Sequence, residues 1–436
     1  MKVLKFGGTS VGSAGRMHKL VSIIDDGKAK IVVLSAMSGT TNSLVEIANA
    51  LYAKENEKAK ALIDALEAKY KQVIKELYKK DGSLKKGEEL IRFHFDHLRS
   101  FTLDMFTANE EKAILAQGEL LSTAMFHYYL EETGKDSVLL PALNFMRIDE
   151  NDEPDLAYIE KHINEELGKN KGHYLYITQG YICRNSFGEI DNLKRGGSDY
   201  TATLIGAAIR SEEIQIWTDI DGMHNNDPRV VEKTYPVTEL SFDEAAELAY
   251  FGAKILHPTC VLPAQKRKVP VRLLNTMEPS AKGTLITDSV SGDRITAVAA
   301  KDGITAIKIK SGRMLLAYGF LRSVFEVFER YKTPIDMITT SEVAVSLTID
   351  HTKNLDAIVK ELGEFGVVEV DTDLTIVCIV GNFKAEKQGY ARRIFDSLKD
   401  IPIRMISYGG SENNVSILVK TVLKKDTLVA LNQGLF

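Results

Sequence analysis

The sequence has few cysteines, and their arrangement argues against two kinds of cross-linked fold. Only Cys183, Cys260 and Cys378 occur among 436 residues, far apart and without a C-x-x-C pair. An odd number of isolated cysteines argues against both a disulfide framework and a zinc site. We therefore expect a reducing compartment, the cytoplasm.

Long apolar runs and an excess of positive charge are also missing. No uncharged apolar run reaches the roughly 18–20 residues that a membrane-spanning helix needs. No signal peptide is expected, because a strand-like segment begins at residue 3 and glycines follow it. The net charge is −5, whereas nucleic-acid-binding proteins are usually basic. We expect neither a membrane nor a nucleic acid as partner.

The length and the alternation of apolar patterns predict an α/β protein of two to four domains. Short runs rich in β-branched residues lie at 3–6, 31–34, 137–140, 175–178 and 214–217. Helical patterns separate several of them, at about 155–167 and 199–210. This alternation is typical of a layered domain with a mostly parallel sheet, and the pattern ends near residue 286.

Residues 44–130 differ from this pattern, because Ala, Glu, Lys and Leu dominate and indicate a largely helical insert. Its many charges are most simply explained by solvated helix faces. His94, Asp96 and His97 would suggest a metal site by their chemistry. We expect them to be ordinary solvated residues instead.

The last 140 residues contain an internal repeat with an offset of 68 to 70 residues. Residues 305–309 correspond to 375–379, Gly319 to Gly389, and Pro334 to Pro402. Each copy is predicted to fold as strand, helix, strand, strand, helix, strand. The offset is the size of a small domain.

The segment of residues 5–10, Lys-Phe-Gly-Gly-Thr-Ser, carries the most chemical information. A strand delivers a lysine and two glycines to the start of a helix, where backbone N–H groups favour phosphate. It is not a Walker A loop. Residues 8–12 also fit the G-x-S-x-G elbow of α/β-hydrolases, although as part of the first strand-to-helix connection they come early for that fold. A purely structural glycine turn is a third possibility.

At this point the sequence resembles the aspartate kinases of the amino-acid kinase superfamily. The resemblance spans nearly the whole chain. The matching segments are residues 5–10 (KFGGTS), 35–42 (SAMSGTTN), 117–119 (QGE), 195–202 (RGGSDYTA), 217–229, and 251–258 (FGAKILHP). The repeated tail resembles a pair of ACT domains.

The resemblance implies a transfer of the γ-phosphoryl group of ATP to the β-carboxylate of L-aspartate. This reaction gives 4-phospho-L-aspartate and ADP, at the start of lysine, threonine and methionine biosynthesis. Since the acceptor carboxylate is already ionised at neutral pH, catalysis should depend on positioning and positive charge. The implied catalytic residues are Lys5 and Lys254, with Asp199 orienting them. Asp199 alternatively serves only as a helix N-cap.

The implied substrate contacts follow the same motifs. Arg195 offers a planar fork for a carboxylate, and Glu119 offers a negative charge for the α-ammonium group. Without the resemblance, Glu119 would be taken for a surface helix residue. The implied amino-acid contacts are Ser35, Thr41, Glu119, Arg195, Gly196, Gly197 and Ser198.

ATP and Mg²⁺ are the implied cofactors, without a protein ligand that we can name for the metal. His224 stands where the family usually has a tyrosine near the adenosine. The implied ATP contacts are Lys5, Phe6, Gly7, Gly8, Thr218, Asp219, His224, Arg229, Lys254 and Ile255.

The tail implies allosteric regulation by an amino acid, lysine or threonine. Leu316 and Ala317 depart from the His-Ser pair of lysine-sensing relatives, and a repeat that serves only dimerisation is the alternative. The implied effector contacts are Met314, Phe320, Leu321, Asp336, Thr340, Ser341 and Glu342.

We therefore predict an amino-acid kinase fold over residues 1–295, an αβα sandwich with a mostly parallel sheet. Two interleaved α+β ACT-like domains (βαββαβ) should follow over 296–436, at about 312–380 and at 296–311 with 381–436. A monofunctional homodimer, possibly a dimer of dimers, is expected. The alternatives are another kinase of the superfamily, a non-catalytic amino-acid sensor and a hydrolase.

Overall fold

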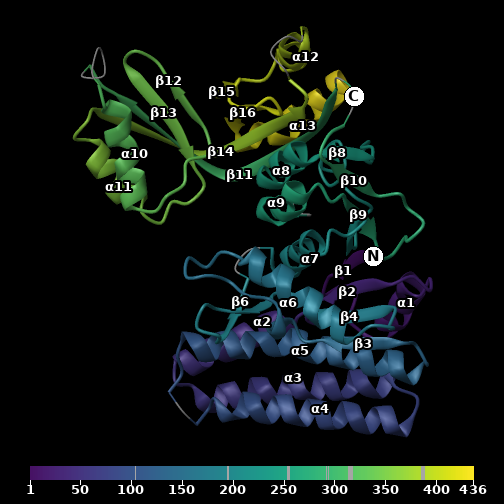
Figure 1. The fold of residues 1–436 in the computed structure, drawn as a ribbon. Coiled ribbons are helices and arrows are strands. Elements are labelled where there is room, and N and C mark those ends of the chain that lie inside the picture. Colours follow the sequence, from purple (N-terminus) through teal and green to yellow (C-terminus); the bar gives the residue numbers. More distant parts are fainter. Residues whose placement is uncertain are drawn as a thin grey trace. The chain divides into compact units, whose positions relative to one another are not determined.

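The computed structural model describes residues 1–103, 105–193, 196–252, 256–290, 292, 294–312, 318–383 and 388–436 (Figure 1). Their contacts divide the chain into two units. The first unit is formed by Met1–Met223, Thr238–Phe242 and Ile255–Val290, and the second by His224–Val237, Asp243–Lys254 and Ser291–Phe436. Two segments that the sequence analysis assigns to residues 1–295 thus group with the tail.

The first unit is built on a mostly parallel sheet in the strand order β3-β4-β2-β1-β7-β9-β10-β8. The central strand β1 pairs in parallel with β2 on one side and with β7 on the other. The strands are β1 (Lys2–Phe6), β2 (Lys30–Leu34), β3 (Ser137–Leu140), β4 (Leu175–Gln179), β7 (Ile214–Thr218), β8 (Glu239–Ser241), β9 (Val271–Asn275) and β10 (Thr284–Thr287). The predicted strands at 137–140, 175–178 and 214–217 are confirmed.

Helices cover this sheet as the αβα prediction requires. One group packs on the sheet through a core that contains Leu4, Phe6, Val32 and Leu34. Its members are α1 (Ala14–Ile24), α2 (Thr40–Tyr52), α3 (Asn56–Leu77), α4 (Asp81–Ser100) and α5 (Ala108–Glu132). The other helices of the unit are α6 (Leu156–Lys169), α7 (Gly197–Ala208) and α9 (Pro258–Arg267), with a 3₁₀ turn at Ala142–Asn144 and a hairpin of β5 (Ile182–Arg184) and β6 (Ile190–Asn192).

The strand order places a binding crevice at the end of β1. The chain proceeds from β1 to β2 in one direction along the sheet, and later resumes on the other side of β1 with β7. Ligands of open α/β sheets bind outside the carboxyl ends of the strands at such a reversal. Lys5 and Phe6 end β1, and Thr218 ends β7, at this position.

The second unit contains a six-stranded sheet in the order β12-β13-β11-β14-β16-β15. The predicted order of elements in each repeat is confirmed. The elements are α8 (Phe242–Tyr250, from its second residue on), β11 (Ile295–Lys310), α10 (Phe320–Arg330), β12 (Ile338–Thr340), β13 (Ala344–Ile349), α11 (Leu355–Leu362), β14 (Val367–Gly381), α12 (Tyr390–Ser397), β15 (Met405–Tyr408), β16 (Asn414–Lys420), a 3₁₀ turn (Thr421–Leu423) and α13 (Lys424–Leu435).

Two long antiparallel strands, β11 and β14, run through the middle of this sheet and serve both repeats (Figure 1). The second half of β11 pairs with β13, and the second half of β14 pairs with β16. Between the halves, β11 shifts register against β14 near Ile304. Each repeat therefore shares its two central strand segments with the other through continuous backbone.

In the described part of the chain, every helix is too short or too polar to cross a membrane.

Candidate active site

A cavity of about 320 Å³ opens at the carboxyl edge of the first unit's sheet. Its walls come from the loop after β1, the loop after β2, helix α5 and the start of α7. The lining residues are Gly8, Ser35, Ala36, Met37, Ser38, Gly39, Thr41, Asn42, Glu119, Tyr181, Gly197 and Ser198. The structure thus brings together Gly8, Ser35, Thr41, Glu119, Gly197 and Ser198, which the sequence analysis named from separate motifs.

Close backbone approaches explain the glycines around this cavity. A side chain at Gly8 would begin 2.8 Å from the carbonyl oxygen of Ala36, and one at Gly118 would begin 2.7 Å from the Ala36 methyl group. Gly196 has φ +68°, which favours glycine. A methyl group there would meet the Cys260 sulfur at 1.9 Å. The loops after β1 and β2 and the start of α7 therefore pack in a way that larger residues would prevent.

Glu119 is the buried acid of the cavity, with 4% of its surface exposed. Its Oε1 accepts a hydrogen bond from the backbone N–H of Ala36 at 3.1 Å, while the buried Oε2 has no protein partner in the described structure. Burial raises the pKa of Glu119 to about 7, against the opposing effect of the Ala36 N–H. The interpretation of Glu119 as a surface residue is wrong, because α5 turns this side chain into the cavity.

Lys5 and Asp199 form an ion pair beside the glycine loop. The Lys5 Nζ lies 2.7 Å from the Asp199 Oδ1, and both side chains are mostly buried. The N-cap of α7 is Gly196, and Asp199 lies in the first turn. The alternative that Asp199 serves only as an N-cap is therefore wrong. The Lys5 Nζ also lies 3.5 Å from the position that a Cβ of Gly7 would take, so the ammonium sits at the loop.

Short polar contacts connect the cavity walls. The Ser35 and Ser198 hydroxyl groups are 2.8 Å apart and share a hydrogen bond. Tyr181, which the sequence analysis did not name, follows β4 and has φ +68°. Its N–H donates to the Thr201 hydroxyl at 2.9 Å. Its place just after the carboxyl end of a parallel strand is the signal that would have identified it.

The remaining predicted ATP contacts lie in both units. In the first unit, Phe6 stacks on Trp217 with ring centroids 5.7 Å apart, and the Thr218 hydroxyl donates to Asp219. In the second unit, His224 Nδ1 shares a hydrogen bond with the Thr234 hydroxyl at 2.8 Å. Arg229 pairs with Asp227 at 2.8 Å. Arg195, Lys254 and Ile255 lie outside the described residues.

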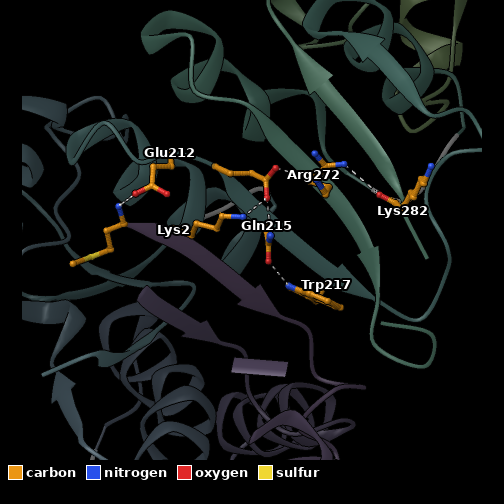
Figure 2. A network of polar contacts seen from close by, with 8 residues as sticks. Lys2, Glu212, Gln215, Trp217, Arg272 and Lys282 are labelled. Carbon is orange, nitrogen blue, oxygen red and sulfur yellow. Dashed lines mark hydrogen bonds and ion pairs between the residues drawn. The ribbon is translucent and has the colours of Figure 1, made fainter. Parts of the chain in front are cut away.

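A second polar network of the first unit lies at the opposite, amino-terminal ends of the strands (Figure 2). Glu213 accepts from Lys2 at 3.2 Å, from Gln215 at 2.6 Å and from Arg272 at 2.9 Å. The Gln215 side chain in turn accepts from the Trp217 indole N–H at 3.1 Å. These bonds satisfy the polar groups on this face of β1, β7 and β9, so we assign the network to the structure of the sheet.

The hydrolase alternative has no support in this geometry. Ser10, the serine of the G-x-S-x-G match, is 4% exposed. Its hydroxyl shares a hydrogen bond with Thr276 at 3.1 Å, and a threonine cannot act as the general base that a serine nucleophile needs.

The predicted effector contacts belong to the second unit. The Asp336 side chain, 1% exposed, accepts from the Tyr250 hydroxyl and pairs with the Lys301 ammonium at 3.0 Å. Thr340, Ser341 and Glu342 are exposed at the end of β12. Phe320 and Leu321 begin α10. Met314, Leu316 and Ala317 lie outside the described residues.

Family models agree with both parts of the fold. The model of the amino acid kinase family matches residues 1–275, and a model of the ACT domain matches residues 377–435. Fold and site thus define an amino acid kinase with a C-terminal ACT region.

The relatives narrow the family further. The chain is 33% identical over 458 residues to lysine-sensitive aspartokinase 3 of Escherichia coli, an alignment that covers 100% of this chain and 99% of the relative. The structure of E. coli aspartokinase III in complex with aspartate and ADP matches at a TM-score of 0.85, with 33% identity and 100% of both chains covered. The complex with lysine and aspartate matches at 0.83, with 33% identity and coverage of 100% and 99%. The chain belongs to the aspartokinases.

Proposed function

We propose that this chain transfers the γ-phosphoryl group of ATP to the β-carboxylate of L-aspartate in the cavity at the end of β1. The observation that carries this proposal is the pairing of two charges in one crevice. A buried carboxylate without a cationic partner, Glu119, faces the cavity, and an ammonium, Lys5, is fixed at the glycine loop by Asp199. The first suits an amino acid and the second a phosphoryl group.

Glu119 would bind the α-ammonium group of aspartate. A positive charge next to a buried carboxylate favours its ionised form, so binding should lower the raised pKa of Glu119. Near pH 7, binding would then release part of a proton. We propose Ser35, Thr41, Arg195 and the loop of residues 196–198 as the contacts of the two substrate carboxylates.

Lys5 would stabilise the charge on the transferring phosphoryl group. The acceptor carboxylate is ionised at neutral pH, so no general base is required. The barrier comes from bringing an anion to a triphosphate, and fixed positive charge lowers that barrier. Asp199 holds the Lys5 ammonium in place, and we propose Lys254 as the second cation. Gly7 and Gly8 allow the phosphates to approach the backbone.

Mg²⁺ would accompany ATP. It is usually held by phosphates, water and one or two carboxylates rather than by an all-protein cage. The described residues contain no cluster of three or more potential metal ligands, which fits this mode, and the exposed Asp219 after β7 is the carboxylate that we propose for it. When bound, the ion neutralises charge on the phosphates.

We propose that the second unit senses an amino acid, as the lysine complex of the relative suggests. We also propose that its two repeats divide near the register shift of β11, one comprising about 304–372 and the other 295–301 with 374–435. A homodimer through this unit is proposed from the resemblance to ACT domains. The three cysteines are buried and unpaired, which supports a cytoplasmic location.

The proposal is tested by ADP release with MgATP and L-aspartate, using the wild type, Lys5→Ala and Glu119→Gln. L-Glutamate and N-acetyl-L-aspartate, which lacks the α-ammonium group, serve as control acceptors, and lysine and threonine are added in turn. Wild-type turnover that needs aspartate and is lost in Lys5→Ala supports the proposal. Turnover only with another acceptor refutes the substrate, and no turnover with any acceptor refutes the enzyme.

A further inference from the structure

Helices α3 and α4 send three polar side chains to the walls of the amino-acid cavity. From α3, the Tyr70 hydroxyl shares a hydrogen bond with the Thr40 hydroxyl at 3.0 Å, and the Lys69 ammonium donates to the Ser38 carbonyl oxygen at 2.7 Å. From α4, His94 Nδ1 lies 2.6 Å from the Gln117 side-chain oxygen. Each partner lies next to or within the set of lining residues.

The Tyr70 bond is fully enclosed. Tyr70 and Thr40 are each 0% exposed. Burial raises the pKa of the Tyr70 phenol well above its ordinary value, so the hydroxyl keeps its proton. Thr40 is the first residue of α2 and directly precedes Thr41, a cavity residue. The bond therefore fixes the point where the loop after β2 becomes a helix.

The His94 bond corrects the expectation that this residue is solvated, because His94 is only 8% exposed. Burial lowers the pKa of its imidazole, which stays neutral. The Gln117 side-chain amide donates to the Ala113 carbonyl oxygen at 2.8 Å, so its oxygen is an acceptor and His94 donates from Nδ1. Asp96 and His97 are exposed, as expected.

The two anchored elements meet at the substrate carboxylate. Gly118 packs against Ala36, and a Cβ at Gly118 would also lie 3.2 Å from the Thr40 methyl group. The next residue, Glu119, accepts from the Ala36 N–H. A shift of α2 or a rotation of α5 would therefore move the Glu119 carboxylate relative to Ser35 and Thr41.

We propose that Tyr70 and His94 are positioning residues of the kinase reaction, which hold the loop after β2 and helix α5 in the register that aspartate binding requires. The inference rests on the proposed function. It gives the helical insert a role in substrate affinity, beyond the burial of its own core.

The test compares Tyr70→Phe with a matched control, Tyr78→Phe. The Tyr78 hydroxyl is also buried in the helical insert and donates to α5, at the Met125 carbonyl oxygen at 2.9 Å. Met125 lies six residues beyond Glu119, about 9 Å along the helix. Both variants lose one buried hydrogen bond and should lose similar thermal stability. Only Tyr70→Phe should raise the KM for aspartate, by about fivefold, the factor for one ordinary hydrogen bond.

The same readout applies to α4. His94→Leu should raise the KM for aspartate, and His94→Asn, which keeps a donor, should restore part of it. The KM for ATP and kcat should stay within about twofold in every variant. An unchanged KM for aspartate in both Tyr70→Phe and His94→Leu, or an equal rise in Tyr78→Phe, would overturn the inference. If the wild type itself has no aspartate-dependent turnover, the proposed function has failed instead.

Discussion

Replacing Glu119 by glutamine should stabilise the unliganded protein while weakening aspartate binding. Burial raises the pKa of Glu119 from 4.5 to about 7. Each pKa unit corresponds to about 1.4 kcal/mol, so keeping this group ionised costs the folded state about 3 kcal/mol above pH 7. A glutamine of similar shape carries no such cost.

The pH dependence gives the sign. For an acid with a raised folded-state pKa, the folded protein binds the proton more tightly than the unfolded chain. Stability is therefore highest below pH 4.5 and falls as the pH rises to about 7. The advantage of Glu119→Gln should be below about 1 kcal/mol at pH 5 and should reach its full value by pH 8. In a unit of this size, the full value corresponds to a rise in Tm of roughly 6 °C.

The assay follows unfolding by tryptophan fluorescence at pH 5.0 to 8.5 without ligands. Trp217 is the single tryptophan and is 6% exposed in the first unit. Glu132→Gln is the control on the same helix. Its carboxylate is buried too, but the Lys79 and Lys80 backbone N–H groups outweigh burial and lower the pKa of Glu132, so this change should destabilise at pH 8. A difference between Glu119→Gln and wild type that stays constant from pH 5 to 8.5 would refute the reasoning.

Three further predictions concern other contacts. Lys5→Met should lower kcat by about 100-fold or more and leave aspartate binding nearly intact, because the ammonium held by Asp199 acts on the phosphoryl group; isothermal titration with aspartate and ADP-release kinetics separate the two effects. Gly196→Ala should destabilise the first unit by about 2 kcal/mol, because its φ of +68° and the cysteine sulfur 1.9 Å from the added methyl leave no room; equal Tm values would contradict this. Lys301→Met should destabilise the second unit by about 3 kcal/mol, since Asp336 would stay buried without its ammonium partner; adding Asp336→Asn should recover part of the loss in urea denaturation.

The sequence predicted the sheet well because its strands carry strong local signals. All five residues of β2 are buried, and buried parallel strands show as continuous apolar runs. The repeat predicted the order of elements in the tail for a similar reason. The apolar and glycine positions recur at a constant offset, so two weak patterns supported each other.

The buried polar groups of the helical insert could not be predicted in the same way. His94 and Glu119 lie in sequences that read as ordinary helix surface. Only the packing of α4 on α5, and of α5 on the loop after β2, determines that these side chains face inward. For Glu119 the family motif supplied the missing information, whereas for His94 no motif did.

The two strands shared by the repeats of the second unit also constrain how this unit is made. The first half of β11 pairs with the second half of β14, about 80 residues later in the chain, and β16 completes that half of the sheet. During synthesis, the first repeat can fold while the other halves of its own long strands still have unpaired edges. Such edges invite pairing with other chains. We therefore expect truncation after residue 372 to give an aggregating fragment rather than a working half of the sensor.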